Sequence, residues 1–190
     1  MEITEIPINC RMGEKVILTR ACVSKFDEMF HLIQSFDDRH NFLNFWPWNK
    51  NAEAVAQFLL QAASDFDNDV RYVFLVVERG SGLIVGIVGV ERTAAIIPAF
   101  HIGYWIGTDH MGQGYATEAT ILARDFVLRH LKPVRLQIMP AQSNEPSIRV
   151  AIKAGFTVKE AILKNAIHGR DRKPDNQVML TYPLEDERPA

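Results

Sequence analysis

Four segments of the chain carry apolar residues at the three-to-four-residue spacing of an amphipathic helix. The first three cover residues 26–33, 54–66 and 116–131. The fourth is a short stretch that Asn144 caps and Gly155 closes, because Asn favours the first position of a helix and Gly its end. Each of these four predicted helices has one apolar face to bury.

Seven other segments are apolar, β-branched runs of strand length. The second and third are separated by a turn that contains Gly80 and Gly82, which indicates a hairpin. The order β-α-α-β-β-β-α-β-α-β-β predicts an α/β (α+β) fold around one mixed sheet, unlike the regular alternation of a doubly wound fold. The predicted strands are residues 16–20, 71–78, 83–91, 100–106, 134–139, 156–163 and 176–184.

Length and composition add limits on what the chain does. A chain of 190 residues without repeats or low-complexity linkers predicts a single domain over residues 1–190. A net charge of −2 argues against a nucleic-acid partner. The N-terminus has no signal-peptide core, and no apolar run reaches the length of a membrane span. With only Cys10 and Cys22, the chain is expected in the reducing cytoplasm.

The segment GTDHMGQGYATEAT, residues 107–120, lies between a predicted strand and a predicted helix. Two glycines there let the backbone approach a ligand, and the first amides of the helix attract an anion such as a phosphate. A strain-relieving turn is the plain alternative. A Walker loop would need Lys-Ser/Thr where Tyr115-Ala116 stands, and a dinucleotide loop would need a third glycine where Thr117 stands. Neither of these loops fits.

Two blocks of sequence resemble the GNAT superfamily of N-acetyltransferases, and in particular its branch of ribosomal-protein N-terminal (Rim-type) enzymes. IGYWIGTDHMGQGYATEA is similar to the coenzyme-A signature, and NEPSIRVAIKAGF, residues 144–156, is similar to a second block of that family. The WPW at residues 46–48 and the late HGRDRKPD also resemble this branch. The signature usually begins with Gln or Arg, and Asp109 stands there instead, so that one contact to phosphate is not expected here.

The resemblance implies a single GNAT-like domain with acetyl-CoA bound where two parallel strands splay apart. These strands are residues 100–106 and 134–139, with the edge near Trp105 and Ile106 pairing with the pantetheine amides. The side chain of Trp105 is equally explained by core packing. The residues that the resemblance assigns to the cofactor are Trp105, Ile106, His110, Met111, Gly112, Gln113, Gly114, Tyr115, Ala116, Thr117 and Asn144.

The catalytic residues follow less directly. Ser147 lies where the family often places a hydroxyl beside the sulfur of coenzyme A, and it could protonate the leaving thiolate; satisfying the N-terminus of its helix is the alternative. Glu91 is the candidate base, acting through water, and a solvated charge beside Arg92 is the alternative. Trp46 and Trp48 are expected either to wall the acceptor pocket or to fill the core.

The predicted activity is therefore the transfer of acetyl from acetyl-CoA to a primary amine by direct attack. The predicted acceptor is a protein N-terminal α-amine, as in the ribosomal-protein type. A small amine (a polyamine, an amino-acid derivative or an antibiotic) is the alternative substrate, and a non-catalytic acyl-CoA sensor is the alternative class. The six histidines show no metal-ligand spacing, so no metal is expected. Neither a nucleic acid nor a membrane is an expected partner, and a monomer or a homodimer fits equally.

Overall fold

The computed structural model describes residues 10–43, 50–94, 96–168 and 173–184. One-turn 3₁₀ helices lie at Val23–Lys25, Asp38–His40 and Thr108–His110. The helices are α1 (Phe26–Gln34), α2 (Ala52–Asp67), α3 (Tyr115–His130) and α4 (Glu145–Lys153). The strands are β1 (Cys10–Met12), β2 (Val16–Arg20), β3 (Arg71–Glu78), β4 (Ile84–Arg92), β5 (Ala99–Ile106), β6 (Arg135–Ile138), β7 (Thr157–His168) and β8 (Lys173–Thr181).

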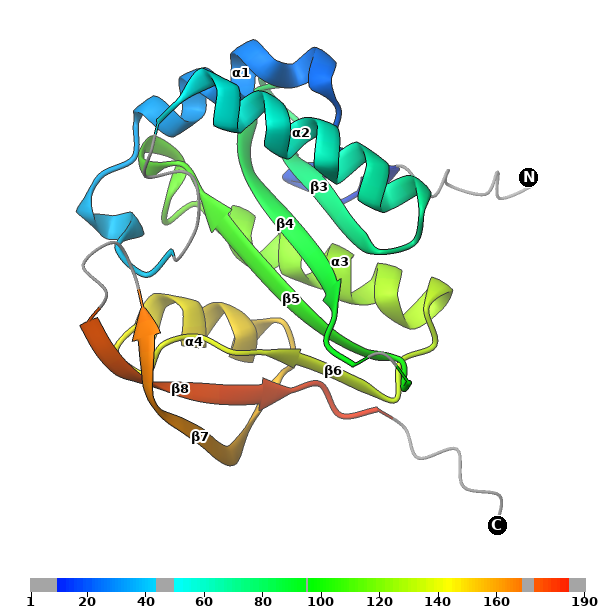
Figure 1. The fold of residues 1–190 in the computed structure, drawn as a ribbon, viewed down its shortest axis with the longest axis vertical. Helices are drawn as coiled ribbons and strands as arrows, with labels where there is room; N and C mark the ends of the chain where they lie inside the picture. The colour runs from blue at the N-terminus through cyan, green and yellow to red at the C-terminus, as the bar shows by residue number, and fades with distance from the viewer. Residues whose placement is uncertain (1–9, 44–49, 95, 169–172, 185–190) are drawn as a thin grey trace.

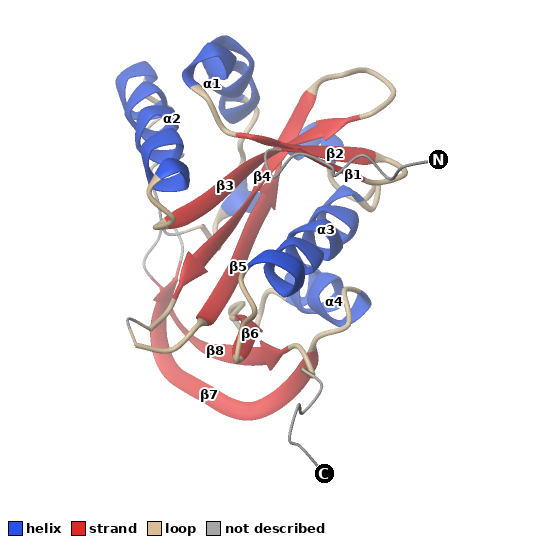
Figure 2. Cartoon of the chain, turned by 90° about the vertical axis from the view of Figure 1, so that its right-hand side faces the viewer, coloured by secondary structure: helices blue, strands red, loops and turns tan. Residues whose placement is uncertain are grey.

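The strands form one sheet in the order β1-β2-β3-β4-β5-β6-β8-β7. All neighbours are antiparallel except β5 and β6, which are parallel and are joined through α3. Helices α1 and α2 cover one face of the sheet, and α3 and α4 cover the other (Figure 2). The central strands are therefore buried on both faces, which explains why β3 reads as an almost unbroken apolar run.

Each face of the sheet has its own apolar core. On the α3 side, Phe74 packs edge-to-face on Phe126 with ring centroids 5.2 Å apart. On the α1 and α2 side, Phe36 meets Trp105 edge-to-face at 4.8 Å. The side chain of Trp105 is thus part of the core, as the alternative from the sequence expected.

The feature that positions the site is the short pairing of β5 with β6. Only three residue pairs join them, the last between His101 and Gln137. Beyond His101, β5 continues to Ile106 while β6 ends at Ile138, and the two strands diverge (Figure 1). The splayed parallel pair expected from the sequence is therefore present, with its apex at His101.

The fold class and the order of the helices and strands are confirmed, and most boundaries lie within two residues of those expected. The C-terminal hairpin departs most, because β7 and β8 extend towards each other beyond the predicted segments. The structure also adds β1, which is too short to leave a periodic pattern and pairs with β2 at the edge of the sheet.

Candidate active site

A cavity of about 560 Å³ opens where β5 and β6 diverge, between the start of α3 and α4. Its described lining includes the cations Arg39, Arg149 and Lys153 and no Asp or Glu. Asp109, the acid that departs from the signature, is exposed and does not line this cavity. The cavity is therefore suited to an anionic ligand, and we call it the donor cavity.

The loop before α3 needs both of its glycines for backbone reasons. Gly112 has φ of +78° and Gly114 has φ of +88°, a left-handed conformation that is costly for residues with a side chain. A Cβ on Gly112 would meet nothing within 4 Å, and one on Gly114 would lie 3.3 Å from Lys15 Nζ. The glycines thus set the path of the loop through their left-handed conformation, and the space beside Gly112 is free of protein atoms.

The N-terminus of α3 is built to receive negative charge. Gly114 is the N-cap residue and no side chain caps this end of the 16-residue helix. The residues from Gly114 to Thr117 line the donor cavity, so the helix begins at its wall. Uncapped amides and the positive end of the helix dipole together favour a phosphate at this position.

The free edge of β5 forms another wall of the donor cavity. Gly107 donates a hydrogen bond from its amide to Val85 at the end next to β4. Because backbone groups alternate sides along a strand, Ile106 and Tyr104 direct theirs to the opposite edge, into the gap. His40 Nε2 donates to the carbonyl of Ile106 at 2.9 Å, and its ring stacks on Phe36. The amides of Tyr104 and Ile106 therefore face the gap.

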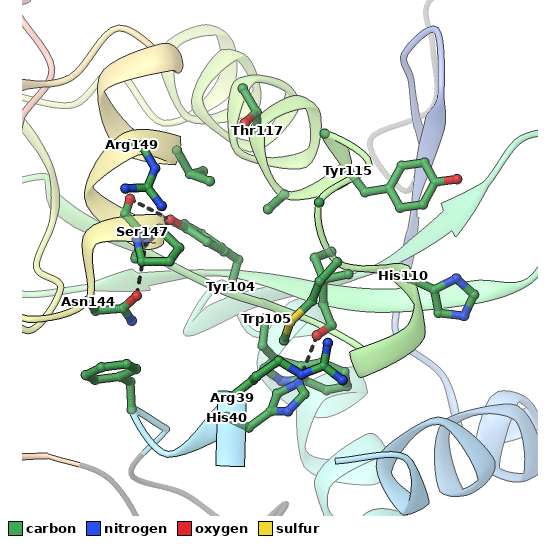
Figure 3. A pocket seen from close by; sticks show the side chains of 18 of the residues that line it. Arg39, His40, Tyr104, Trp105, His110, Tyr115, Thr117, Asn144, Ser147 and Arg149 are labelled. Carbon is green, nitrogen blue, oxygen red and sulfur yellow. Dashed lines mark hydrogen bonds between the residues drawn. The ribbon is translucent and has the colours of Figure 1, made fainter. Parts of the chain in front are cut away.

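A pair of hydroxyl groups lies at the far side of the donor cavity (Figure 3). Tyr104 Oη and Ser147 Oγ are 2.8 Å apart, and Tyr104 also donates to the carbonyl of Ser147 at 3.0 Å. Burial raises the pKa of Tyr104 to about 12. Helix α4 is capped by Asn144, whose Oδ1 accepts from the amide of Ser147 at 3.2 Å. The hydroxyl of Ser147 is thus not used for capping.

A second cavity, of about 480 Å³, lies on the α1 and α2 face of the sheet, and we call it the acceptor cavity. It shares part of its lining with the donor cavity, and so the two meet at the splay. The shared residues are Phe42, Leu43, Tyr104, Trp105, Asn144 and Ser147. Two ligands approaching from opposite faces of the sheet would meet beside Tyr104 and Ser147.

Glu91 lies in the acceptor cavity, on β4. Its carboxylate is 3.5 Å from Arg71 on β3, and its side chain is 54% exposed. Arg92, the expected neighbour, instead lies over the ring of Phe100. The carboxylate is therefore accessible from the cavity and has an arginine beside it.

The structure gathers most of the expected cofactor residues on the donor cavity. These are Trp105, Ile106, His110, Met111, Gly112, Gly114, Tyr115, Ala116, Thr117 and Asn144. Gln113 does not line it; its carbonyl accepts from Lys15 on the far side of the loop. The hydroxyl of Tyr115 points away from Tyr104 and donates to Gln113 and Glu78 (Figure 3). Trp46 and Trp48 lie outside the described residues.

Sequence reasoning missed several residues of these walls. Tyr104 stands 43 positions from its partner Ser147, and only the packing of α4 against β5 brings them together. Its position inside the recognised signature was the one available signal. Arg39, His40, Arg149 and Lys153 were likewise not singled out as site residues.

The donor cavity fits acetyl-CoA by the chemistry of its walls. An uncapped helix start and Lys153 suit the phosphates, with Arg39 and Arg149 as further cations that also pair with Asp37 and Glu145, and free strand amides suit the pantetheine arm. No cluster of three or more His, Cys, Asp or Glu that could hold a metal ion occurs in the described ranges. Within those ranges, too, no helix has the length and apolar character needed to cross a membrane.

Comparison with known proteins was consistent with this geometry. Residues 15–157 match the acetyltransferase (GNAT) domain family. The probable N-acetyltransferase YjcK of Bacillus subtilis (strain 168) is 31% identical over 124 residues, which are 64% of this chain and 67% of that protein.

Solved structures share the fold at lower identity. The microcin C7 self-immunity acetyltransferase MccE, in complex with acetyl-CoA and AMP, is 20% identical with a TM-score of 0.81, over 96% of this chain and all (100%) of that one. The ribosomal-protein-S5-alanine acetyltransferase from Vibrio fischeri is 18% identical with a TM-score of 0.82, over 95% and 99%.

Proposed function

The chain belongs to the acetyltransferase (GNAT) family and uses acetyl-CoA, and on that premise we propose that its acceptor is the N-terminal α-amine of a protein. The observation that supports this proposal most is the charge of the acceptor cavity. Its described charged residues are Arg71 and Glu91, which lie 3.5 Å apart, and Arg71 also pairs with Asp65 at 2.9 Å, so the cavity offers one exposed carboxylate that an arginine partly screens. A polyamine would gain little from such a wall, whereas the single charge of a chain terminus needs no acidic surroundings.

The ordinary pKa of the acceptor supports the same choice. An α-amine has a pKa near 8, and a lysine amine has one near 10.4. A larger fraction of the α-amine is therefore neutral at pH 7, and a modest base suffices to complete its deprotonation. A cytoplasmic setting, which supplies acetyl-CoA and newly made protein termini, is part of this proposal, as is a single transferase domain over residues 1–190.

We assign the donor to the donor cavity. The thioester of acetyl-CoA supplies the acyl group. The start of α3 and the loop residues that line the cavity, 110–112 and 114–117, hold the phosphates, with Arg149 and Lys153 as the nearby cations. The amides of Tyr104 and Ile106 hold the pantetheine arm and the carbonyl oxygen, in place of the backbone of Trp105 that the sequence suggested.

We assign the proton steps to the residues where the cavities meet. The attacking amine forms the C–N bond as the C–S bond breaks, and the sulfur leaves as a thiolate. Ser147 protonates that thiolate, and Tyr104 replaces the proton through their hydrogen bond. Glu91 is the carboxylate on the path by which the amine loses its proton, through water.

The test measures thiol release from acetyl-CoA by the purified chain with three matched amines. These are a lysine-free peptide with a free N-terminus, a peptide with a blocked N-terminus and one lysine, and spermidine. We expect the free α-amine to be acetylated at least about tenfold more efficiently, as kcat/KM, than either other amine, with mass spectrometry locating the acetyl group on the terminus. Preference for spermidine or lysine would overturn the acceptor, and binding of acetyl-CoA without turnover of any amine would overturn catalysis.

A further inference from the structure

A row of polar residues crosses the middle of the sheet. Arg71 on β3, Glu91 on β4 and His101 on β5 are successive partners in register. Gln137 on β6 and Thr181 on β8 continue the row on the other side of His101. Gln137 and Thr181 are both buried, and the residues next to them along their strands belong to the apolar core. His101 is the centre of this row and the last residue of β5 that pairs with β6.

The next row towards the splay on the same face of the sheet has no side chains at all on β4 and β5. Gly89 and Gly103 are partners, and the row after them pairs Ile87 with Trp105. All of these residues, with Glu91 and His101, line the acceptor cavity. A Cβ added to Gly89 would find its nearest neighbour, the carbonyl oxygen of Gly103, 4.0 Å away. The glycine pair is therefore not required by crowding and leaves a hollow in the cavity floor, which we call the glycine hollow.

The imidazole of His101 leans over one end of this hollow. A Cβ on Gly103 would lie 3.6 Å from His101 Nε2, so the ring extends along β5 towards the splay. The other ring nitrogen, Nδ1, is buried and has no hydrogen-bond partner among the described residues. Nε2 thus faces the space where an acceptor would lie, and no described group competes for it there.

The surroundings of His101 favour its neutral form at pH 7. Burial lowers the pKa of His101, and the carboxylate of Glu91 opposes this in part. Arg71 and Glu91 are the charged groups among the described residues of the cavity, with Tyr104 as a further titratable group. Gln137 and Gln177, from β6 and β8, bring no charge. A neutral imidazole has a lone pair to accept a proton, and Glu91 stabilises the imidazolium that results.

We propose that the acceptor amine lies in the glycine hollow and gives its proton to His101, with Glu91 as the positioning carboxylate. This rests on the proposed amine acetylation and deepens it, with the proton of the amine passing to His101 instead of reaching Glu91 through water. The ammonium loses one proton to the imidazole, and the nitrogen lone pair then attacks the thioester. Amide formation releases a second proton, which balances the one that the thiolate takes from Ser147. The imidazolium finally returns its proton to water.

The first experiment is the pH dependence of kcat/KM for His101→Gln and Glu91→Gln, with His31→Gln on the exposed face of α1 as the control. It uses whichever amine the wild type acetylates best, so it does not depend on the identity of the acceptor. We expect His101→Gln to lose roughly 10²-fold or more in kcat at pH 7, and to lose the acid limb of the profile that His101 produces. Glu91→Gln should move that limb to lower pH without removing it.

The opposite pattern would overturn the proposal. If Glu91→Gln abolishes the acid limb while His101→Gln keeps both the limb and kcat within about twofold, the carboxylate is the base. The affinity for acetyl-CoA, measured by calorimetry, should stay within about twofold in both variants, because neither residue lines the donor cavity. A large loss of that affinity in His101→Gln would show a structural role and would also overturn the assignment.

The second experiment tests the glycine hollow by filling it. Gly89→Ala has room for its methyl group, so the variant should fold, and Gly80→Ala in the β3–β4 turn adds a methyl in open space as the control. We expect Gly89→Ala to raise KM for the amine about tenfold, with unchanged acetyl-CoA affinity and an unchanged melting temperature. An unchanged KM would place the acceptor elsewhere and overturn this part of the proposal.

Discussion

The hydroxyl groups of Tyr104 and Ser147 lie 2.8 Å apart at the wall that the donor and acceptor cavities share. One comes from the sheet and the other from the first turn of α4. Because Asn144 already caps that helix, the serine hydroxyl is left to its contact with the tyrosine. Two hydroxyl groups, neither of which caps a helix, are thus held at the point where the substrates would meet.

Removing either hydroxyl should slow turnover without weakening donor binding. We expect Ser147→Ala to lower kcat roughly 10²-fold and Tyr104→Phe roughly tenfold, because a positioned proton donor contributes at least that much. The double variant should be no worse than Ser147→Ala, since the two act in one path. Steady-state kinetics and acetyl-CoA calorimetry check this, and fully multiplied losses would contradict a shared path.

Asn144 should contribute to stability through its cap. Asn144→Ala is expected to lower the free energy of unfolding by about 1 kcal/mol, because the amide of Ser147 loses its acceptor. Asn144→Asp keeps an acceptor oxygen at the same place and should retain most of that stability. Urea denaturation without acetyl-CoA measures both. Equal losses in the two variants would show that the cap is not what stabilises this end of α4.

Replacing Gly112 or Gly114 should weaken acetyl-CoA binding more than replacing another glycine that has the same left-handed conformation. Gly112→Ala and Gly114→Ala should each cost roughly 1–2 kcal/mol of stability, because both φ angles are left-handed. They should also reduce the rise in melting temperature that acetyl-CoA produces. Gly82→Ala carries the same strain, at φ of +74°, in the β3–β4 turn. If acetyl-CoA raises the melting temperature of Gly82→Ala as little as it raises that of the two loop variants, the loop does not hold the donor.

Stability should depend on pH through two histidines. Burial lowers the pKa of His40 and of His101 below 6.5, so their stabilising contribution is complete above that pH. As pH falls further, the unfolded chain binds protons that the folded chain does not, and stability drops by up to about 1.4 kcal/mol per pH unit for each group. We expect His40→Gln, and more so His40→Gln with His101→Gln, to flatten this dependence in the range just below pH 6.5.

Urea denaturation across that range measures the slope. Asp37 does not confuse the result, since its bonds with Arg39 hold its pKa at about 2 and its contribution is lost only at much lower pH. A slope that is unchanged in the double variant would show that neither imidazole is protected from protons in the folded state.

The sequence predicted the fold well because local patterns carry it. The apolar faces of α2 and α3 and the β-branched runs of β3 and β4 are each complete within one segment. The short strand β1 could not be seen, since three residues define no period. That β5 and β6 splay apart was expected through resemblance, but the end of their pairing at His101 was not, because no local pattern says where two strands separated by a helix stop pairing.

The site was less predictable, for a physical reason. The loop from His110 to Thr117 is contiguous, and so its composition reveals it. Tyr104 meets Ser147, and Gly89 meets Gly103, only through the packing and register of separate elements. Either glycine taken alone is an ordinary strand residue, and only the pairing makes a hollow. A site formed by residues that are close only in the folded structure cannot be identified from any single stretch of sequence.

The brevity of the β5–β6 pairing has a consequence for the order of events. A slit in the sheet with a cavity on each side gives each substrate its own entrance, so neither has to leave before the other arrives. We therefore expect a sequential kinetic pattern, with double-reciprocal plots that intersect. Free coenzyme A should compete with acetyl-CoA and leave the amine's entrance open. If the two cavities hold the two substrates as proposed, the early end of the β5–β6 pairing is what lets both reactants be present together when the bond forms.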